Sequence, residues 1–152
     1  MRIAIGSDHA GFRLKQHILR NLGSKYDFID MGAYSEDSVD YPDYARKVAE
    51  AILDGSADRG ILVCGTGIGM CIAANKFPGI YAALVYSDET AILARRHNNS
   101  NVICLGGRTM DYDAALRWVE LWINEGFEGG RHSRRVGKIM EVERELCGRG
   151  SR

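Results

Sequence analysis

Short apolar runs, rich in β-branched residues, alternate along the chain with longer amphipathic stretches. Each run ends at polar or glycine residues, which is typical of a buried strand. Strands that alternate with helices predict a parallel sheet with helices on both of its faces. The five expected strands cover residues 2–5, 27–30, 60–63, 81–85 and 102–105. In such folds a ligand is expected at the loops that follow the strands.

The amphipathic stretches predict six helices, each with one apolar stripe. Phe12, Leu14 and Ile18 begin the first stripe, and Pro42 suits the first turn of the second helix. The last helix follows Gly129 and Gly130, and the sequence does not decide whether it packs on its own domain or on a partner subunit. Five of the expected helices cover residues 12–22, 44–52, about 89–97, about 112–124, and 131–146. The third in chain order follows the glycines at 65, 67 and 69 and continues through 72–74.

Composition narrows the class of protein. The 152 residues, 45% of them hydrophobic, suffice for one buried core, so we expect a single domain over residues 1–152. Lys plus Arg equals Asp plus Glu at 20 each, so no overall charge draws the chain to nucleic acid or to an anionic membrane. No apolar stretch approaches the roughly 18 residues that a membrane span needs. We therefore expect a cytoplasmic protein that binds neither nucleic acid nor membrane.

The four cysteines are Cys64, Cys71, Cys104 and Cys147. None forms a Cys-x-x-Cys pair or has a histidine at zinc-finger spacing, so the sequence indicates neither a disulfide framework nor a metal site. Free thiols are the expectation.

Three glycines, Gly65, Gly67 and Gly69, directly follow the third strand and open a helix. Exposed amides there, with the helix dipole behind them, can bind a phosphate, a carboxylate or a transient oxyanion. A tight strand-to-helix turn explains the same spacing. A dinucleotide fingerprint would need glycine where Met70 stands, although Asp88 lies at a suitable distance to bind a ribose.

Cys64 stands at the head of this glycine loop. The helix N-terminus and converging amides favour its thiolate, so the position suits chemistry. A small apolar residue that ends a buried strand is the alternative interpretation, and it fits Cys104 and Cys71 better.

Three further clusters carry charge or imidazole groups. Asp8 and His9 close the first strand, where an acid also serves as a helix N-cap. His97 and Asn98 follow the fourth helix as a possible proton carrier and a hydroxyl reader, in a segment that also reads as a helix C-cap. The cationic residues are Arg108, after Gly106 and Gly107, and the pair Arg131 and Arg135, which lie one helical turn apart and can clamp a phosphate or form a solvated basic face.

Together these motifs closely resemble the ribose-5-phosphate isomerase B family, which includes isomerases of galactose and allose 6-phosphates. The resemblance spans nearly the whole chain, although residues 111–125 and those beyond 145 contribute little to it. It rests on Gly6-Ser-Asp-His-Ala-Gly11, Asp40-Tyr-Pro42, Cys64-Gly-Thr-Gly-Ile-Gly69, Ala73-Ala-Asn-Lys76, Arg96-His-Asn-Asn-Ser-Asn101 and Gly129-Gly-Arg-His132.

The resemblance implies a three-layer, doubly wound, Rossmann-like domain with a five-stranded parallel sheet. It also implies a homodimer with active sites built from both subunits, and leaves open whether dimers pair into tetramers. His97 would open the sugar ring, and Asp8 and Asn98 would hold hydroxyls. The remaining implied contacts are Tyr41 to the sugar, and His9, Arg108, Arg131 and Arg135 to the phosphate.

The family has two branches, one with a thiol base at the position of Cys64 and one with a glutamate at the position of Met70. Methionine cannot take a proton, so this chain matches the thiol branch. Thr66 would then help to move protons between O1 and O2. We expect Cys64 to pass a proton from C2 to C1 of ribose 5-phosphate, with the enediolate held by the amides of Gly65, Gly67, Ile68 and Gly69 and with no cofactor or metal.

Three other functions remain open at this point. The same motifs suit an isomerase of a six-carbon sugar phosphate, because pocket depth is not visible in the sequence. A dinucleotide-binding module is disfavoured by Met70. A subunit that needs a different catalytic partner, as in heteromeric relatives, would show no activity on its own.

Overall fold

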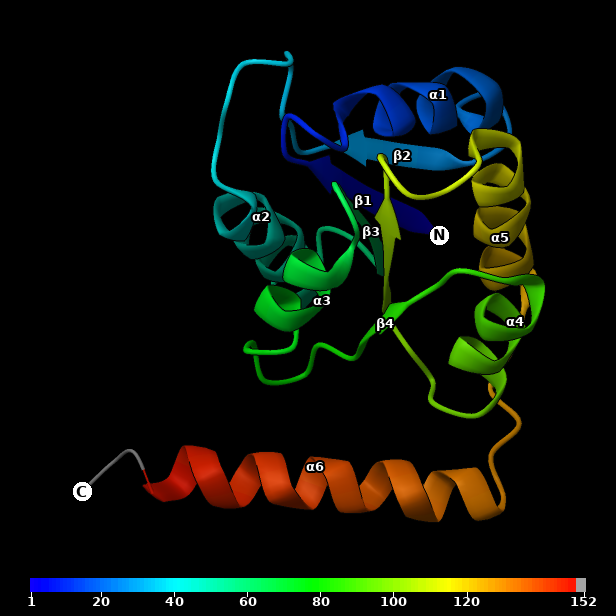
Figure 1. The fold of residues 1–152 in the computed structure, drawn as a ribbon. Coiled ribbons are helices and arrows are strands. Elements are labelled where there is room, and N and C mark those ends of the chain that lie inside the picture. The colour runs from blue at the N-terminus through cyan, green and yellow to red at the C-terminus, as the bar shows by residue number, and fades with distance from the viewer. Residues whose placement is uncertain (150–152) are drawn as a thin grey trace.

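The computed structural model describes residues 1–149 and shows a five-stranded parallel sheet between two layers of helices (Figure 1). This confirms the predicted α/β class. The strands are β1 (Arg2–Ser7), β2 (Asp27–Asp30), β3 (Arg59–Cys64), β4 (Ala82–Leu84) and β5 (Val102–Gly106). The helices are α1 (Phe12–Leu22), α2 (Tyr41–Leu53), α3 (Ile68–Ala74), α4 (Asp88–Arg96), α5 (Tyr112–Asn124) and α6 (Arg131–Arg149).

Local sequence signals explain where several elements begin and end. Pro42 lies in the first turn of α2, as predicted, although that helix starts at Tyr41 rather than residue 44. Ser87 and Thr90 form a reciprocal capping box at the start of α4. That helix ends at Arg96, so His97 is its C-cap rather than its last helical residue.

The strand order is β2-β1-β3-β5-β4. From β1 the chain moves outward to β2 and then crosses back to β3 on the other side of β1. The direction of winding therefore reverses between β1 and β3. In doubly wound sheets the crevice at this reversal, outside the carboxyl ends of the strands, is where ligands bind. Asp8 follows β1 directly, and Cys64 is the last residue of β3, so both lie at this crevice.

Alternate strand residues build two separate cores. Ile5, Val63 and Leu105 face the layer formed by α1, α4 and α5. Leu62, Cys64 and Cys104 face the opposite layer, formed by α2 and α3. The period of two along each strand fixes these faces, so the side chain of Cys64 points toward α2 and α3.

Helix α6 differs from the others, because it runs along the lower side of the molecule and lies apart from the sheet (Figure 1). Of its 19 residues only His132 and Val136 are buried. Among residues 1–149 no helix is both long and apolar enough to cross a membrane. A single domain over residues 1–152 stays a prediction, and residues 150–152 lie outside the described part of the chain.

Candidate active site

The loop between β3 and α3 holds Cys64 within reach of backbone amides. The amide of Gly67 donates a hydrogen bond to Sγ of Cys64 at 3.2 Å. This geometry needs glycine at position 67, because φ there is 82°, in the left-handed region. The amide of Ile68 donates to Oγ1 of Thr66 at 3.3 Å. The hydrogen bond from Gly67 therefore holds Sγ of Cys64 at the start of α3.

Backbone hydrogen bonds join this loop to the loops after β1 and β5, which lie beside it at the carboxyl ends of the strands. The amide of Gly107 donates to the carbonyl of Cys64 at 2.8 Å, and that of Arg108 to the carbonyl of Gly65 at 2.9 Å. On the other side, the amide of Asp8 donates to the carbonyl of Val63 at 3.1 Å. The loops after β1, β3 and β5 therefore form one connected unit around Cys64.

Asp8 and His9, after β1, are both partly committed to backbone contacts. Oδ1 of the buried Asp8 accepts a hydrogen bond from the amide of Gly11 at 2.9 Å, but Gly11 and not Asp8 is the N-cap of α1, so the capping role considered from the sequence is wrong. Nδ1 of His9 lies 3.2 Å from both the amide and the carbonyl of Val39. These bonds fix the two side chains and leave Oδ2 of Asp8 and Nε2 of His9 free for a ligand.

A hollow of about 290 Å³ opens beside these loops. His9 and Arg108, two of the predicted phosphate ligands, line it together. Arg13 also lines it and is held by Glu36, with Nε of Arg13 2.5 Å from Oε1 of the glutamate. Glu36 lines the hollow too and neutralises Arg13, so Arg108 and the imidazole of His9 are the groups left to hold an anion.

Tyr41 reaches the same loop from the start of α2. A Cβ atom at Gly69 would lie 2.8 Å from Cζ of Tyr41, so the glycine lets the ring rest against α3. The structure therefore brings together Asp8, His9, Tyr41, Arg108 and the loop from Cys64 to Gly69.

The other four predicted site residues lie near the amino-terminal ends of the strands, at the opposite end of the sheet from Cys64. His97 and Asn98 stand between α4 and the first residue of β5, whereas Cys64 pairs with the last, Gly106. With a rise of about 3.3 Å per residue, the length of β5 separates the two ends by about 15 Å. Arg131 and Arg135, at the start of α6, are on the side of His97. One chain does not bring these residues to Cys64.

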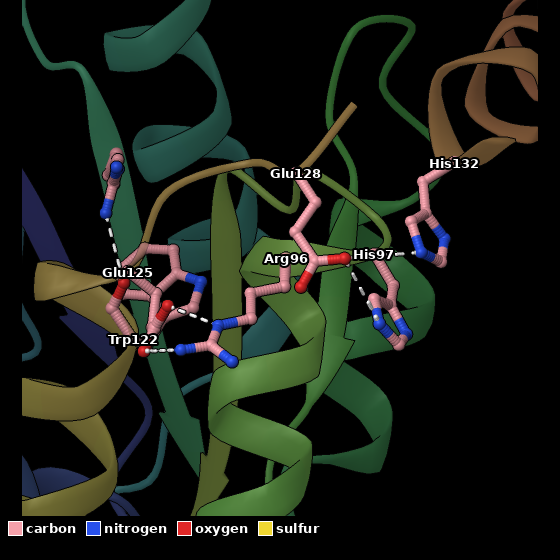
Figure 2. A network of polar contacts seen from close by, with 7 residues as sticks. Arg96, His97, Trp122, Glu125, Glu128 and His132 are labelled. Carbon is pink, nitrogen blue, oxygen red and sulfur yellow. Dashed lines mark hydrogen bonds and ion pairs between the residues drawn. The ribbon is translucent and has the colours of Figure 1, made fainter. Parts of the chain in front are cut away.

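His97 forms a cluster with Glu128 and His132 (Figure 2). Nε2 of His97 lies 3.9 Å from Oε2 of Glu128, and Nε2 of His132 lies 3.5 Å from the same oxygen. The imidazoles stack, with centroids 4.0 Å apart and planes at 11°. Burial lowers the pKa of His132, and the nearby His97 and Arg131 act in the same direction.

These three residues are the one group in residues 1–149 whose ligand atoms lie close enough to hold a metal ion, within 4.8 Å of one another. Their geometry does not suit one. Imidazole lone pairs lie in the ring plane, and two nearly parallel rings direct them side by side instead of toward a common point. As they stand, the two rings cannot share a tetrahedral ion with Glu128.

The two residues on which the dinucleotide-binding alternative depends, Met70 and Asp88, have other contacts in the structure. Met70 is fully buried in the core under α3. The Asp88 carboxylate accepts a hydrogen bond from Nε1 of Trp118 at 3.1 Å and pairs with Arg117, so it is not free to bind a ribose. The four cysteines are free thiols, as expected.

Sequence reasoning assigned no role to Glu128 or His132. No helical periodicity indicated their contact, because Glu128 lies before α6 and is separated from the helix by Gly129 and Gly130. The stack of His132 on His97 had no local signal, because 35 residues separate the two rings along the chain.

Known proteins with similar sequences and structures are described as sugar-phosphate isomerases. A family model described as Ribose/Galactose Isomerase matches residues 3–139. The ribose-5-phosphate isomerase B of Escherichia coli strain K12 is 44% identical over 143 residues, which cover 93% of this chain and 96% of that protein. A Clostridium thermocellum ribose-5-phosphate isomerase B structure is 49% identical with a TM-score of 0.94, covering 96% of this chain and 99% of that one. The Mycoplasma genitalium ribose-5-phosphate isomerase B, solved with bound ribulose-5-phosphate, is 46% identical with a TM-score of 0.90, covering 95% and 97%.

Proposed function

We propose that this chain, which belongs to the ribose/galactose isomerase family, interconverts ribose 5-phosphate and ribulose 5-phosphate with Cys64 as the base. The observation that carries the proposal is the place of Cys64. It ends β3 at the point where the sheet reverses its winding, in a chain 46% identical to the Mycoplasma genitalium enzyme that was solved with ribulose-5-phosphate. The thiol therefore lies where the fold binds ligands.

In the chemical step the Cys64 thiolate removes the proton from C2 of the open-chain aldose and returns it to C1. The electron pair of the C2–H bond moves into an enediolate between these steps. The amides of Gly65 and Gly69 support the negative oxygen, since those of Gly67 and Ile68 donate to Sγ of Cys64 and Oγ1 of Thr66. Losing one such donor costs about 3 to 4 kcal/mol of barrier in other enzymes. Thr66 carries the proton between O1 and O2. The step consumes no redox equivalent and needs no cofactor or metal.

In this proposal the substrate binds with its phosphate in the hollow beside the loops. His9 and Arg108 hold the phosphate, while Asp8 and Tyr41 contact the sugar. Fixing the phosphate end places C2 against Cys64, so the binding energy of a remote group contributes to orientation at the reacting carbon.

The working unit is a homodimer in this proposal. His97 and Asn98 of the partner subunit open the ring and hold a hydroxyl, and Arg131 and Arg135 of the partner subunit bind the phosphate. Two observations support it. These four residues lie at the end of the sheet away from Cys64 in their own chain. Helix α6 also exposes Ile139, Val142 and Leu146 by 51%, 56% and 60%, a face that a second copy can cover. Pairing of dimers into tetramers and cytoplasmic residence stay predictions.

Replacing Cys64 by alanine tests the proposal. Turnover of ribose 5-phosphate should fall by at least about a thousandfold, because no other group takes the C2 proton. The matched control is Cys71→Ala, which removes a half-buried thiol of α3 and should retain turnover. Turnover that survives in Cys64→Ala would rule out the thiol base.

The same assay decides between five-carbon and six-carbon substrates. The EDTA-treated protein is given ribose 5-phosphate and allose 6-phosphate side by side, so that substrate and metal dependence are measured together. Faster turnover of allose 6-phosphate would transfer the proposal to the six-carbon branch of the family. Activity of the purified chain alone would exclude the need for a different catalytic partner.

A further inference from the structure

His97 is held from two sides by residues that the reaction above does not use. Its imidazole follows the last turn of α4, where the amide of His97 donates to the carbonyl of Leu93 at 2.9 Å. The His132 ring lies parallel to it at 4.0 Å, and Figure 2 shows the Glu128 carboxylate turned toward both rings. A parallel neighbour at van der Waals distance fixes the plane of a ring.

Backbone contacts hold these neighbours in place. The amide of Glu128 donates to the carbonyl of Arg96 at 3.0 Å, and the amide of His132 donates to the carbonyl of Gly129 at 3.0 Å. Nearby, Nε of Arg96 lies 2.7 Å from Oε2 of Glu125. The segment between α5 and α6 is therefore fastened to the end of α4.

The two rings differ in their exposure and in the charges around them. Glu128 attracts a proton to either ring, but two imidazolium ions 4.0 Å apart would repel each other. His132 is 6% exposed, and its Nε2 has no hydrogen-bond partner, whereas the His97 side chain is 33% exposed. The cations near His132 are Arg131 and Arg135, and Arg96 is paired with Glu125. Of the two rings, His97 is therefore the one that solvent and a substrate can reach.

We propose that Glu128 and His132 are positioning residues for His97, with His132 fixing the plane of its imidazole and Glu128 stabilising its protonated form. The inference rests on the ring-opening role proposed above for His97. In that step neutral His97 takes the proton of the C1 hydroxyl, the C1–O bond to the ring oxygen breaks, and the imidazolium gives the proton to that oxygen. A carboxylate that stabilises the imidazolium makes the proton transfer easier.

Glu128→Gln tests the electrostatic part. Removing the carboxylate destabilises the imidazolium, so the pKa of His97 should fall by about one unit. The chain has four histidines, and single-histidine variants assign their imidazole signals in an NMR titration. The acid limb of the kcat/KM profile should move to lower pH by the same amount. The matched control, Glu125→Gln, removes the carboxylate bound to Arg96 and should leave the His97 titration in place. Equal titrations in both variants would overturn this part.

His132 is tested by comparing phenylalanine with alanine at this position. Phenylalanine keeps a flat ring against His97, whereas alanine removes it. We expect kcat to fall about tenfold in His132→Ala with KM nearly unchanged, and to stay within about twofold in His132→Phe. Urea midpoints confirm that both variants are folded at the assay temperature. Full kcat in the alanine variant, or equal losses in both folded variants, would overturn the stacking role.

The NMR titration separates this inference from the proposed function, because it needs no turnover. If Cys64→Ala remained active, the assignment of the base would fall while the His97 titration could still respond to Glu128. If Glu128→Gln left the titration unchanged, the inference would fall and the Cys64 mechanism would stand.

Discussion

The region at the carboxyl ends of the strands, around Cys64, and the region at their amino ends, around His97, are built in different ways. Around Cys64, the loops after β1, β3 and β5 are joined by backbone hydrogen bonds and lie against glycines that admit close contact. Around His97, the segment from Glu125 to α6 is held to the end of α4, and then the helix runs on with an exposed apolar side. The loops around Cys64 are joined within one chain, whereas α6 is tied to its own chain by the bonds of Glu143 to Gly79 and Tyr81 and leaves three of its apolar side chains more than half exposed.

This difference shows how a small fold can divide an active site. Parallel strands bring their carboxyl ends together, so the topology alone gathers Asp8, Cys64 and Arg108. Residues that lead into a strand, such as His97 before β5, are placed at the opposite end of the sheet by the same topology. In the proposed dimer, a second copy is turned so that its His97 side meets the Cys64 side of the first, which combines the two sets.

The largest effect is expected from mixing two inactive variants, which tests whether each active site is built from two chains. Cys64→Ala and His97→Ala should each lose activity when pure, because each removes one half of every site. After joint unfolding and refolding, half of the dimers are hybrids with one intact site, so about one quarter of wild-type activity should return. No recovery in samples shown to contain hybrids would mean that both residues act within one chain.

The next prediction concerns a substitution that would introduce strain between the loop after β1 and the end of β3. A Cβ at Gly11 would lie 2.2 Å from the carbonyl oxygen of Val63, a contact between two backbones that cannot rotate away. Gly11→Ala should therefore lower the free energy of unfolding by about 3 kcal/mol, measured by urea denaturation. Gly126→Ala is the control, because a Cβ there meets nothing within 4 Å. Similar stabilities of the two variants would contradict the tight fit of the loops.

A charge on the exposed side of α6 tests the region around His97. Ile139→Glu replaces an apolar side chain that is 51% exposed in the single chain. If a second copy covers it, the dimer should weaken by about 2 kcal/mol, or roughly 30-fold, as measured by sedimentation across a dilution series. The control is Glu141→Gln, on the same helix. An unchanged dimer would place the contact elsewhere.

The smallest expected effect comes from Gly137, in the interior of α6. A Cβ there meets nothing within 4 Å apart from the backbone of its own helix, and glycine is a poor helix former. Gly137→Ala should raise stability by about 0.5 to 1 kcal/mol, seen as a higher urea midpoint. A lower midpoint would indicate that a neighbouring chain approaches α6 closely at this residue.

Much of the fold was predictable because it depends on local patterns. The bounds of β2 and α5 agree with the apolar runs, and Pro42 marked the first turn of α2. Strand ends were less accurate. β1 continues to Ser7 because Ser7 pairs with Val63 of β3, and such pairing depends on a strand more than fifty residues away.

The site was predictable to the extent that it follows strands. Asp8 directly follows β1 and Cys64 is the last residue of β3, and the parallel sheet places them together. The distance from Cys64 to His97 could not be predicted, because the length of β5 and the order of the strands determine it. The pairing of His97 with His132 depends on how the segment after α5 folds back, which no local pattern encodes.

The joined loops have a consequence for length variation among related chains. An inserted residue in any of them would break hydrogen bonds such as that from Gly107 to Cys64 and would push a neighbouring loop outward. The exposed segment 35–38, between β2 and α2, carries no such bond to β3 or β5. Insertions and deletions should therefore accumulate there and beyond the apolar part of α6, while the spacing from each strand to its loop stays constant.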